Sequence, residues 1–258
     1  MEKQKQGPVT RTLARAIAIL HVFDETRPEL GVTEIGELTG LDKSTVYRLL
    51  SALQQGGLIE QNAETARYHL GFGLLRLAGL ALQHLDLPRI ARPYLQALAD
   101  RTRETVSLSL LADDDRIVHV AVVESPLRVR NVEEIGSQRP LHAGSEGKVM
   151  LAYLTDERLK AILDRDLIQF SERTPVDAAK LRRQLARIRK RGYGRARGEL
   201  EEGLNDVAAP IRNHEGQVVA VIGVSGPSFR LPKARLVELG QMVKETADRI
   251  SREIGYVE

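Results

Sequence analysis

The apolar residues between Val32 and Gln55 recur with the period of an α-helix in two short segments that are joined by a turn. Thr33 is the expected N-cap of the first segment, and Gly40 ends it because glycine adopts the left-handed C′ conformation without a Cβ clash. Asp42 is the expected N-cap of the second segment. The pattern predicts a helix–turn–helix pair whose second helix buries one apolar face, formed by Val46, Leu49, Leu50 and Leu53.

The opposite face of that second helix is polar, and it consists of Lys43, Ser44, Thr45, Tyr47, Arg48 and Ser51. An α-helix fits the major groove of DNA, and short hydroxyl or basic side chains near its N-terminus reach phosphates and base edges. Lys43 can pair with a phosphate, and Arg48 can contact a guanine through two hydrogen bonds. A helical hairpin with an ordinary solvated face explains the two helices equally well, so the flanking residues must distinguish these interpretations.

The residues before the pair predict another helix, from Thr10 to Thr26, with Leu13, Ile17 and Leu20 on its apolar face. Arg11 and Arg15 are one turn apart and therefore share a face that can contact a DNA backbone. Two solvated arginines are the alternative.

The residues after the pair predict a two-stranded hairpin, because LIEQ (58–61) and RYHL (67–70) flank a turn-rich stretch. Three helices followed by such a hairpin form a winged helix-turn-helix, in which Arg67 and Tyr68 of the wing can reach a neighbouring phosphate or the minor groove. The wing favours DNA binding, since a chance helical hairpin does not predict it.

The segment 71–86 carries leucines around most of a helix. A helix that is apolar on most sides must be buried on most sides, and two small flanking domains do not supply that cover. We interpret the segment as a linker helix that packs on a second copy of the chain, which predicts a homodimer. Burial between the chain's own two domains is the alternative.

Beyond residue 87 the hydrophobic period changes repeatedly between that of helices and that of strands. Helices are expected at 88–103, 147–154, 181–191 and 232–254, and strands at 106–112, 116–124, 128–133, 206–212 and 218–226. This order predicts an α+β domain with a mainly antiparallel sheet. The expected organisation is a winged helix-turn-helix domain (8–71), a linker helix (72–86) and a second domain (87–258).

Composition adds little to this picture. A length of 258 residues suits two domains, and the sequence has no stretch of about 20 apolar residues, no signal-peptide pattern and no cysteine. These features predict a cytoplasmic protein that does not enter a membrane. The net charge is +3, but residues 1–86 carry nine lysines and arginines against ten acidic residues. DNA binding therefore depends on where the basic side chains lie and not on overall charge.

Two glycine-containing stretches of the second domain are candidate ligand sites. In PLHAGSEGK (140–148) a loop enters a helix, so the free amides near Gly144 can bind an anion and Ser145 can add a hydroxyl. In GVSGP (223–227), Ser225 can face the same cavity. Glycines that are needed only for chain turns are the alternative.

Enzyme motifs receive little support. Ser145 and Lys148 match S-x-x-K, but no S-D-N or K-T-G motif follows, and no P-loop or dinucleotide fingerprint is present. The six histidines have no spacing of three or four residues that is typical of a zinc site. We therefore expect no catalytic residue, metal or cofactor, and we retain an S-x-x-K hydrolase as the rival hypothesis.

Six stretches in this order resemble the IclR-type (isocitrate lyase regulator family) transcription regulators: RTLARAIAIL, DKSTVYRLL, YHLGFGLLRLA, PLHAGSEGKVMLA, GELEEGLNDVAAPI and VIGVSGPSFRL. The resemblance covers almost the whole chain. It implies a winged helix-turn-helix, a linker helix and a GAF-like effector-binding domain. Members are dimers or tetramers that bind operator DNA and respond to small metabolites, often organic or aromatic acids, so the resemblance implies a homodimer or a homotetramer.

The resemblance also implies which residues act. DNA recognition falls on Lys43, Ser44, Thr45 and Arg48, and the residues expected beside them at the DNA are Arg11, Arg15, Thr33, Tyr47 and Arg67. The effector-binding residues would be His142, Ala143, Gly144, Ser145, Leu204, Asp206, Gly223 and Ser225. The function implied is that of a ligand-responsive regulator that binds double-stranded operator DNA and lacks catalytic activity.

Two positions depart from the family pattern, because Asp206 is often cysteine there and Gly223 is often serine. A carboxylate in the pocket repels an anionic effector unless it is protonated or points away. A ligand with hydroxyl or amine donors, or a cation, suits Asp206 better, whereas the amides near Gly144 favour an organic acid. Exposure of Asp206 to solvent at a strand start is the remaining alternative.

Overall fold

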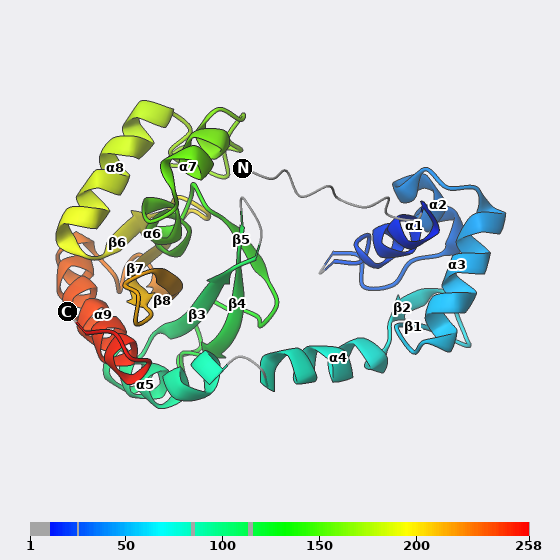
Figure 1. Cartoon of the computed structure of the whole chain (residues 1–258), viewed down its shortest axis with the longest axis horizontal. Helices are drawn as coiled ribbons and strands as arrows, with labels where there is room; N and C mark the ends of the chain where they lie inside the picture. The colour runs from blue at the N-terminus through cyan, green and yellow to red at the C-terminus, as the bar shows by residue number, and fades with distance from the viewer. Residues whose placement is uncertain (1–10, 25, 84–85, 113–115, 258) are drawn as a thin grey trace. The chain divides into compact units, whose positions relative to one another are not determined.

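The computed structural model describes residues 11–24, 26–83, 86–112 and 116–257. The chain divides into two compact units, residues 1–84 and 85–258 (Figure 1). Among the described residues, no helix is both long and apolar enough to cross a membrane.

The first unit is a winged helix-turn-helix, as predicted. Its elements are α1 (Arg11–Leu20), α2 (Val32–Thr39), α3 (Lys43–Gln55), β1 (Ile59–Gln61), β2 (Tyr68–Leu70) and α4 (Phe72–Gln83). β1 and β2 pair in antiparallel fashion and form the wing. The four apolar residues expected to point inward from α3 are all buried, and they form one core with Ile19, Ile35 and Ile59. Gly40 ends α2 in the left-handed conformation, also as predicted.

α1 differs from the prediction in two details. α1 ends at Leu20, because the Asp24 carboxylate accepts hydrogen bonds from the backbone and hydroxyl of Thr26 and thereby stabilises a turn in place of further helix. The buried residue of α1 is Ile19, whereas Leu13 and Ile17 are exposed. Thr10, at the start of the predicted helix, lies outside the described residues.

The N-cap of α2 is Gly31 and not Thr33, which lies exposed within the first turn. The backbone N–H of Gly31 donates to the Glu34 carboxylate over 2.7 Å. α4 covers Phe72–Gln83 of the predicted linker, while residues 84 and 85 of that segment lie outside the described part of the chain.

The second unit is built on a six-stranded, fully antiparallel sheet in the order β5-β4-β3-β8-β7-β6. The strands are β3 (Thr105–Leu111), β4 (Arg116–Val123), β5 (Gln138–Pro140), β6 (Gly194–Arg197), β7 (Leu204–Arg212) and β8 (Val218–Pro227). The helices are α5 (Asp86–Thr102), α6 (Ser145–Ala152), α7 (Asp156–Leu163), α8 (Ala178–Arg191) and α9 (Lys233–Glu253). This α+β architecture with an antiparallel sheet confirms the predicted fold class.

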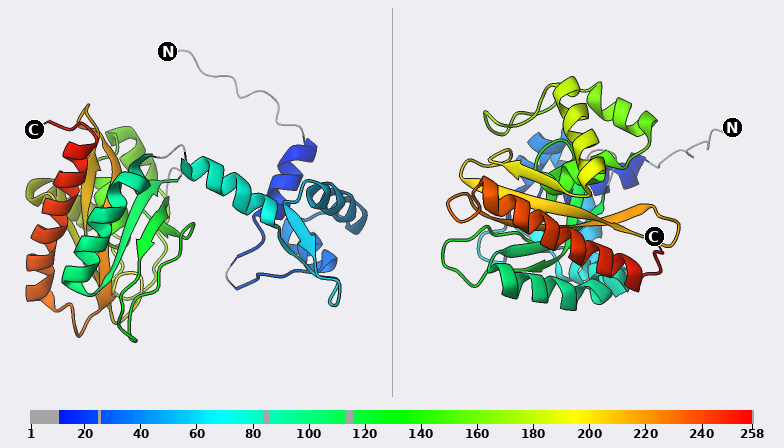
Figure 2. Two further views of the ribbon diagram at one scale, coloured as in Figure 1. Left: turned by 90° about the horizontal axis from the view of Figure 1, so that it is seen from below. Right: turned by 90° about the vertical axis from the view of Figure 1, so that its left-hand side faces the viewer.

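Helices cover both faces of the sheet. α5 and α9 lie side by side on one face, and α6, α7 and α8 lie on the other (Figure 2). Alternate residues of one strand therefore enter different cores: Val207 and Ala209 of β7 pack toward α5 and α9, whereas Ala208 packs toward α6 and α8. Strands buried on both faces explain the long apolar runs of β7 and β8.

Several elements of this unit were predicted wrongly or missed. Residues 128–133 are irregular, because backbone carbonyls there accept hydrogen bonds from side chains: that of Val129 from Arg230, and that of Asn131 from Thr105. The edge strand beside β4 is instead β5. The sequence interpretation also missed α7 and β6, and α6 begins at Ser145, two residues before the predicted start.

Candidate functional site

The amino end of α3 is held by Asp42. Its carboxylate accepts hydrogen bonds from the Thr45 backbone N–H (2.9 Å), the Thr45 hydroxyl (2.8 Å) and the Ser44 hydroxyl (2.6 Å). The hydrogen bond from Ser44, followed by those from Thr45, holds the pKa of Asp42 far below its usual range. Because Thr45 is only 9 % exposed, the expectation that it lies on the solvent face of α3 is wrong.

The exposed face of α3 carries Lys43, Ser44, Tyr47, Arg48 and Ser51. Within the described part of the chain, neither Lys43 nor Arg48 forms an ion pair or a side-chain hydrogen bond. Both cations of this face are therefore available to an anionic partner, and Tyr47 adds a ring that is 56 % exposed. This arrangement can read a DNA groove.

The wing residues are used within the unit. The Arg67 guanidinium donates to the Glu29 carbonyl over 2.9 Å and forms a 2.8 Å ion pair with Glu34. Tyr68 is buried in the core, which contradicts the expectation that it reaches a phosphate. Arg11 is exposed and Arg15 is partly buried on α1, and their contact with DNA remains a prediction, as does that of exposed Thr33.

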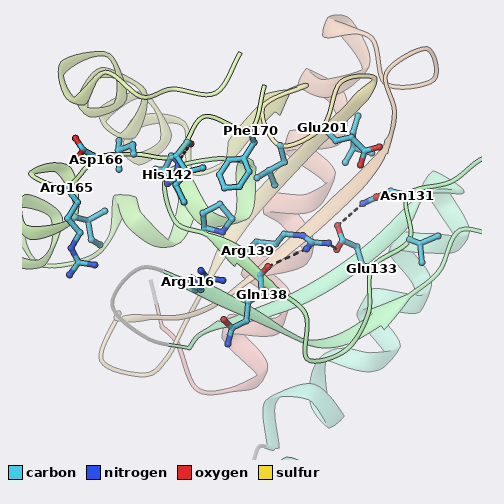
Figure 3. Close-up of a pocket in the computed structure, with 17 residues that line it drawn as sticks. Arg116, Asn131, Glu133, Gln138, Arg139, His142, Arg165, Asp166, Phe170 and Glu201 are labelled. Atoms are coloured by element: carbon cyan, nitrogen blue, oxygen red, sulfur yellow. Dashed lines mark hydrogen bonds and ion pairs between the residues drawn. The ribbon is translucent and has the colours of Figure 1, made fainter. Parts of the chain in front are cut away.

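The second unit contains a pocket of about 420 Å³ (Figure 3). Its lining includes Arg116, Asn131, Glu133, Arg139, His142 and Phe170. The His142 ring stacks on Phe170 with centroids 5.8 Å apart, and its Nε2–H donates to the Ile168 carbonyl over 2.8 Å. These contacts fix His142 as one wall of the pocket.

A small recess shares Glu133, Arg139 and Leu204 with this pocket and leads to the start of α6. It is lined by six of the expected effector residues: Ala143, Gly144, Ser145, Leu204, Asp206 and Ser225. Gly144 has φ 75°, and a Cβ there would meet Leu200 Cδ1 at 2.8 Å, so both backbone and space require glycine. Residues that were predicted from three distant stretches of the sequence thus line one recess.

Gly223 has a different role from the one expected. A Cβ at this position would lie 2.7 Å from the Glu146 carboxylate, so the glycine makes room for that buried side chain. The family that the sequence resembles often has serine at this position, whereas glycine here accommodates the Glu146 side chain.

The amides at the start of α6 are already hydrogen-bonded to two carboxylates of the chain itself. The Ser145 N–H donates to Asp206 Oδ1 over 2.5 Å, and the Gly144 N–H donates to Glu199 Oε2 over 3.2 Å. Burial raises the pKa of Asp206 against the opposing hydrogen bond from the Ser145 N–H, and burial also raises the pKa of Glu199 against the attraction of Lys148. Asp206 therefore lines the recess, and its expected alternative at an exposed strand start is wrong.

Lys148 forms an ion pair with Glu199 and donates to Gln184 Oε1 over 3.0 Å. The Ser145 hydroxyl is buried and makes no hydrogen bond in the described part of the structure. A lysine held by Glu199 is not placed to activate that serine, so the geometry lends no support to an S-x-x-K hydrolase.

Comparisons with known proteins decide the family. Residues 12–63 match the model of the IclR helix-turn-helix domain, and residues 79–252 match that of the bacterial transcriptional regulator IclR C-terminal region. The chain belongs to the IclR family. As a member of this family it is a DNA-binding regulator of transcription, and its relatives carry names of regulators.

Individual relatives span nearly the whole chain. It is 34 % identical to the transcriptional regulator XynR of Escherichia coli over 96 % of this chain and 99 % of the relative. The transcriptional repressor AllR of Escherichia coli is 33 % identical over 95 % and 90 %. Among solved structures, an IclR homolog from Microbacterium hydrocarbonoxydans complexed with 4-hydroxybenzoate has a TM-score of 0.82 at 28 % identity, over 94 % of this chain and 98 % of that one.

This IclR-family chain also holds a buried polar network that the sequence interpretation missed. Ser107 and Ser109 each donate to Glu146 Oε1 over 3.0 Å, and His119 lies 3.0 Å from Glu133. The serines are two apart in an otherwise apolar strand and so face the same side. Polar residues at one face of apolar strands are the signal that could have revealed the network.

The network favours a doubly protonated His119. Ser109 uses its only proton toward Glu146, so it accepts a hydrogen bond from His119 Nδ1 at 2.8 Å, while Nε2 points to Glu133. Burial alone would lower the pKa of His119, but the carboxylates of Glu146 and Glu133 outweigh burial and the repulsion of Arg139, and the pKa is raised. Burial also raises the pKa of Glu146.

These raised pKa values predict that the second unit loses stability as the pH rises. His119 contributes fully below its unfolded pKa of about 6.5 and loses its contribution as the pH passes its higher folded pKa. The raised pKa of Glu146 acts in the same direction. Urea unfolding midpoints from roughly pH 6 to pH 9 should fall, and His119→Gln should flatten that fall. An unchanged slope in the variant would contradict the assignment to His119.

Proposed function

We propose that this IclR-family regulator binds double-stranded operator DNA through α3 and is modulated by a small organic or aromatic acid bound in the pocket of the second unit. The observation that carries the proposal is the exposed face of α3, where Lys43 and Arg48 have no ion-pair partner among the described residues. The pocket of about 420 Å³ offers room for a small organic or aromatic acid. The relative complexed with 4-hydroxybenzoate supports an aromatic acid as one candidate.

We assign one function to each of the three segments predicted from the sequence. Residues 8–71 bind DNA in the cytoplasm, residues 72–86 link the two parts, and residues 87–258 bind the effector. The ligand acts by binding one arrangement of two DNA-binding units more tightly than another. The change in DNA affinity that the ligand causes cannot exceed the difference between its affinities for the two arrangements.

We further propose that the regulator is a homodimer or a homotetramer. On α4 the large apolar side chains of Phe72, Leu75, Leu77 and Leu80 are exposed, with Leu75 at 68 %. Leu13 and Ile17 of α1 are exposed as well. Clustered apolar side chains of this kind indicate a surface that another chain covers.

A charge on α4 should therefore weaken assembly. We expect Leu75→Glu to shift sedimentation toward the monomer, because a carboxylate would have to lose its hydration on association. Leu38→Glu is the matched control, since Leu38 is an exposed leucine on α2. Equal assembly of wild type and Leu75→Glu would argue against α4 as the interface.

The function is tested by a gel shift with the DNA that flanks the chain's own gene, with and without small organic acids. We expect a retarded fragment whose affinity changes with one of the acids. Ser145→Ala distinguishes the regulator from the rival hypothesis of an S-x-x-K hydrolase. A hydrolase would lose turnover, whereas the regulator should bind operator DNA with unchanged affinity in the absence of ligand. Failure to retard any flanking fragment would count against the proposed function.

A further inference from the structure

A separate pocket of about 240 Å³ lies between α8 and β6, the last strand of the sheet (Figure 1). It shares no lining residue with the larger pocket or with the recess at the start of α6. Five arginines line it, and we call it the arginine pocket: Arg173, Arg187, Arg191, Arg195 and Arg197. Neither the proposed DNA interface nor the proposed effector site gives these arginines a role.

Regular secondary structure positions four of the five arginines. Gln184, Arg187 and Arg191 follow one another at intervals of three and four residues, so they share one face of α8. Arg195 and Arg197 are two residues apart and share one face of β6. The cluster is therefore a consequence of the fold and not of one arginine-rich loop.

Arg173 reaches the pocket from a loop that is bound to the end of β6. The Ser171 hydroxyl donates to the Gly198 carbonyl, and the Thr174 hydroxyl donates to the Glu199 carbonyl, each over 2.6 Å. A Cβ at Gly198 would lie 3.6 Å from Arg173 Nη1, so the guanidinium group lies beside this glycine. Three separate segments thus bring arginines to one pocket.

The positive charges of the arginine pocket are not balanced by acids. Among the described residues that line it, Glu199 is the only acid, and it forms an ion pair with the buried Lys148. The Lys148 ammonium group also donates to Gln184 Oε1 over 3.0 Å. In the part of the chain that the structure describes, four of the arginines form no ion pair: Arg173, Arg187, Arg195 and Arg197. The pocket therefore carries an excess of positive charge.

The guanidinium groups lie close enough to repel one another. The Arg191 Nε–H donates to the Tyr193 carbonyl over 2.5 Å, and its guanidinium group lies 4.9 Å from the centroid of the Tyr193 ring. Burial first, and then the charges of Arg195 and Arg187, lower the pKa of Arg191. Repulsion of this kind destabilises a fold until an anion binds, and locally unfavourable arrangements are typical of functional sites.

We propose that the arginine pocket binds a small phosphorylated metabolite through a diphosphate group. A guanidinium group matches the oxygens of a phosphate with two parallel hydrogen bonds. A diphosphate carries several negative charges in a volume that a pocket of about 240 Å³ accommodates. A monocarboxylate would leave most of the positive charge unbalanced. The inference is independent of the effector and of the DNA that the regulator binds.

The test is calorimetric titration of the full chain with pyrophosphate, orthophosphate and citrate. We expect saturable binding of pyrophosphate that is about tenfold tighter than that of the other two anions, which is the effect of one further hydrogen bond between charged groups. Arg187→Gln and Arg197→Gln should each weaken pyrophosphate by about tenfold. Arg182→Gln is the matched control, because Arg182 is an exposed arginine of α8 that does not line the pocket.

Urea unfolding distinguishes a binding role from a structural one. Arg187 and Arg197 are exposed, and among the described residues their side chains form no hydrogen bond or ion pair. Their replacement should leave the unfolding midpoint of the free chain unchanged or higher, because one repulsive charge is lost. Pyrophosphate should raise the midpoint of the wild type more than that of either variant. Arg187→Lys should bind pyrophosphate more tightly than Arg187→Gln, since lysine keeps the charge without the paired hydrogen bonds.

Three results would overturn the inference: no binding of pyrophosphate, binding of citrate as tight as that of pyrophosphate, or unchanged binding of pyrophosphate in Arg187→Gln and Arg197→Gln. A DNA backbone on the same surface would overturn it as well. Non-operator DNA would then displace pyrophosphate, and Arg187→Gln would lower the slope of DNA affinity against salt concentration by about one, whereas we expect an unchanged slope. A chain that binds pyrophosphate but retards no operator fragment keeps the inference and loses the proposed function.

Discussion

Replacing Lys148 by methionine is expected to destabilise the second unit by about 3–5 kcal/mol, which is the usual effect of removing one partner of a buried ion pair. Lys148 is 1 % exposed, and its ammonium group binds Glu199, Gln184 Oε1 (3.0 Å) and the Arg195 carbonyl (3.4 Å). Methionine fills similar space but leaves the Glu199 carboxylate buried without its counter-charge. The measurement is urea unfolding of the full chain, with hydrogen exchange to assign the loss to the second unit.

Two control variants sharpen this prediction. Lys148→Met combined with Glu199→Leu removes both charges and should recover much of the loss, because a buried pair can often be replaced by apolar residues at little net cost. Lys180→Met removes an exposed lysine from the first turn of α8 and should change stability by less than about 0.5 kcal/mol. A double variant as unstable as the single one would show that the uncompensated charge is not the cause.

The sequence predicted best what depends on neighbouring residues. The N-cap at Asp42, the C-cap at Gly40 and the buried face of α3 are each encoded within one or two helical turns, and the structure confirms all three. The wing also follows from two short strands around a turn. Local patterns of this kind are sufficient to define the winged helix-turn-helix.

The errors arose where backbone groups form hydrogen bonds with side chains that are distant in the sequence. Residues 128–133 alternate like a strand, yet their carbonyls bind Thr105 and Arg230, which lie far away in the sequence. At α6 the amides were expected to be open, but Asp206 occupies one of them from β7. Periodicity and spacing carry no information about such partners.

The candidate site was therefore predicted in position but only partly in chemistry. Resemblance to the family placed six residues that do line one recess. It did not reveal Glu146, Glu133 and His119, which come from α6, from an irregular segment and from β4 and lie together only in the folded chain. The polarity of this cluster depends on contacts between residues that are far apart in the sequence.

The second large effect is expected at Arg48, where alanine should weaken binding to the operator by about 1–3 kcal/mol and relax specificity at one base pair. Arg48 is exposed on α3 and forms no ion pair among the described residues. Its guanidinium therefore gives up no ion pair when the chain binds DNA. A guanine offers two acceptors in the major groove that match the guanidinium. The measurement is a binding titration against operator fragments that differ by single base pairs.

Lys43→Ala is the informative comparison, because Lys43 is the other cation of that face that has no ion-pair partner among the residues described. A phosphate contact should weaken all sequences alike and lower the slope of affinity against salt concentration by about one. Arg182→Ala, an exposed arginine of α8 in the other unit, controls for the loss of one positive charge. If Arg48→Ala weakens every fragment uniformly, Arg48 contacts the backbone, and base recognition must come from other residues of α3 such as Ser44, Tyr47 or Ser51.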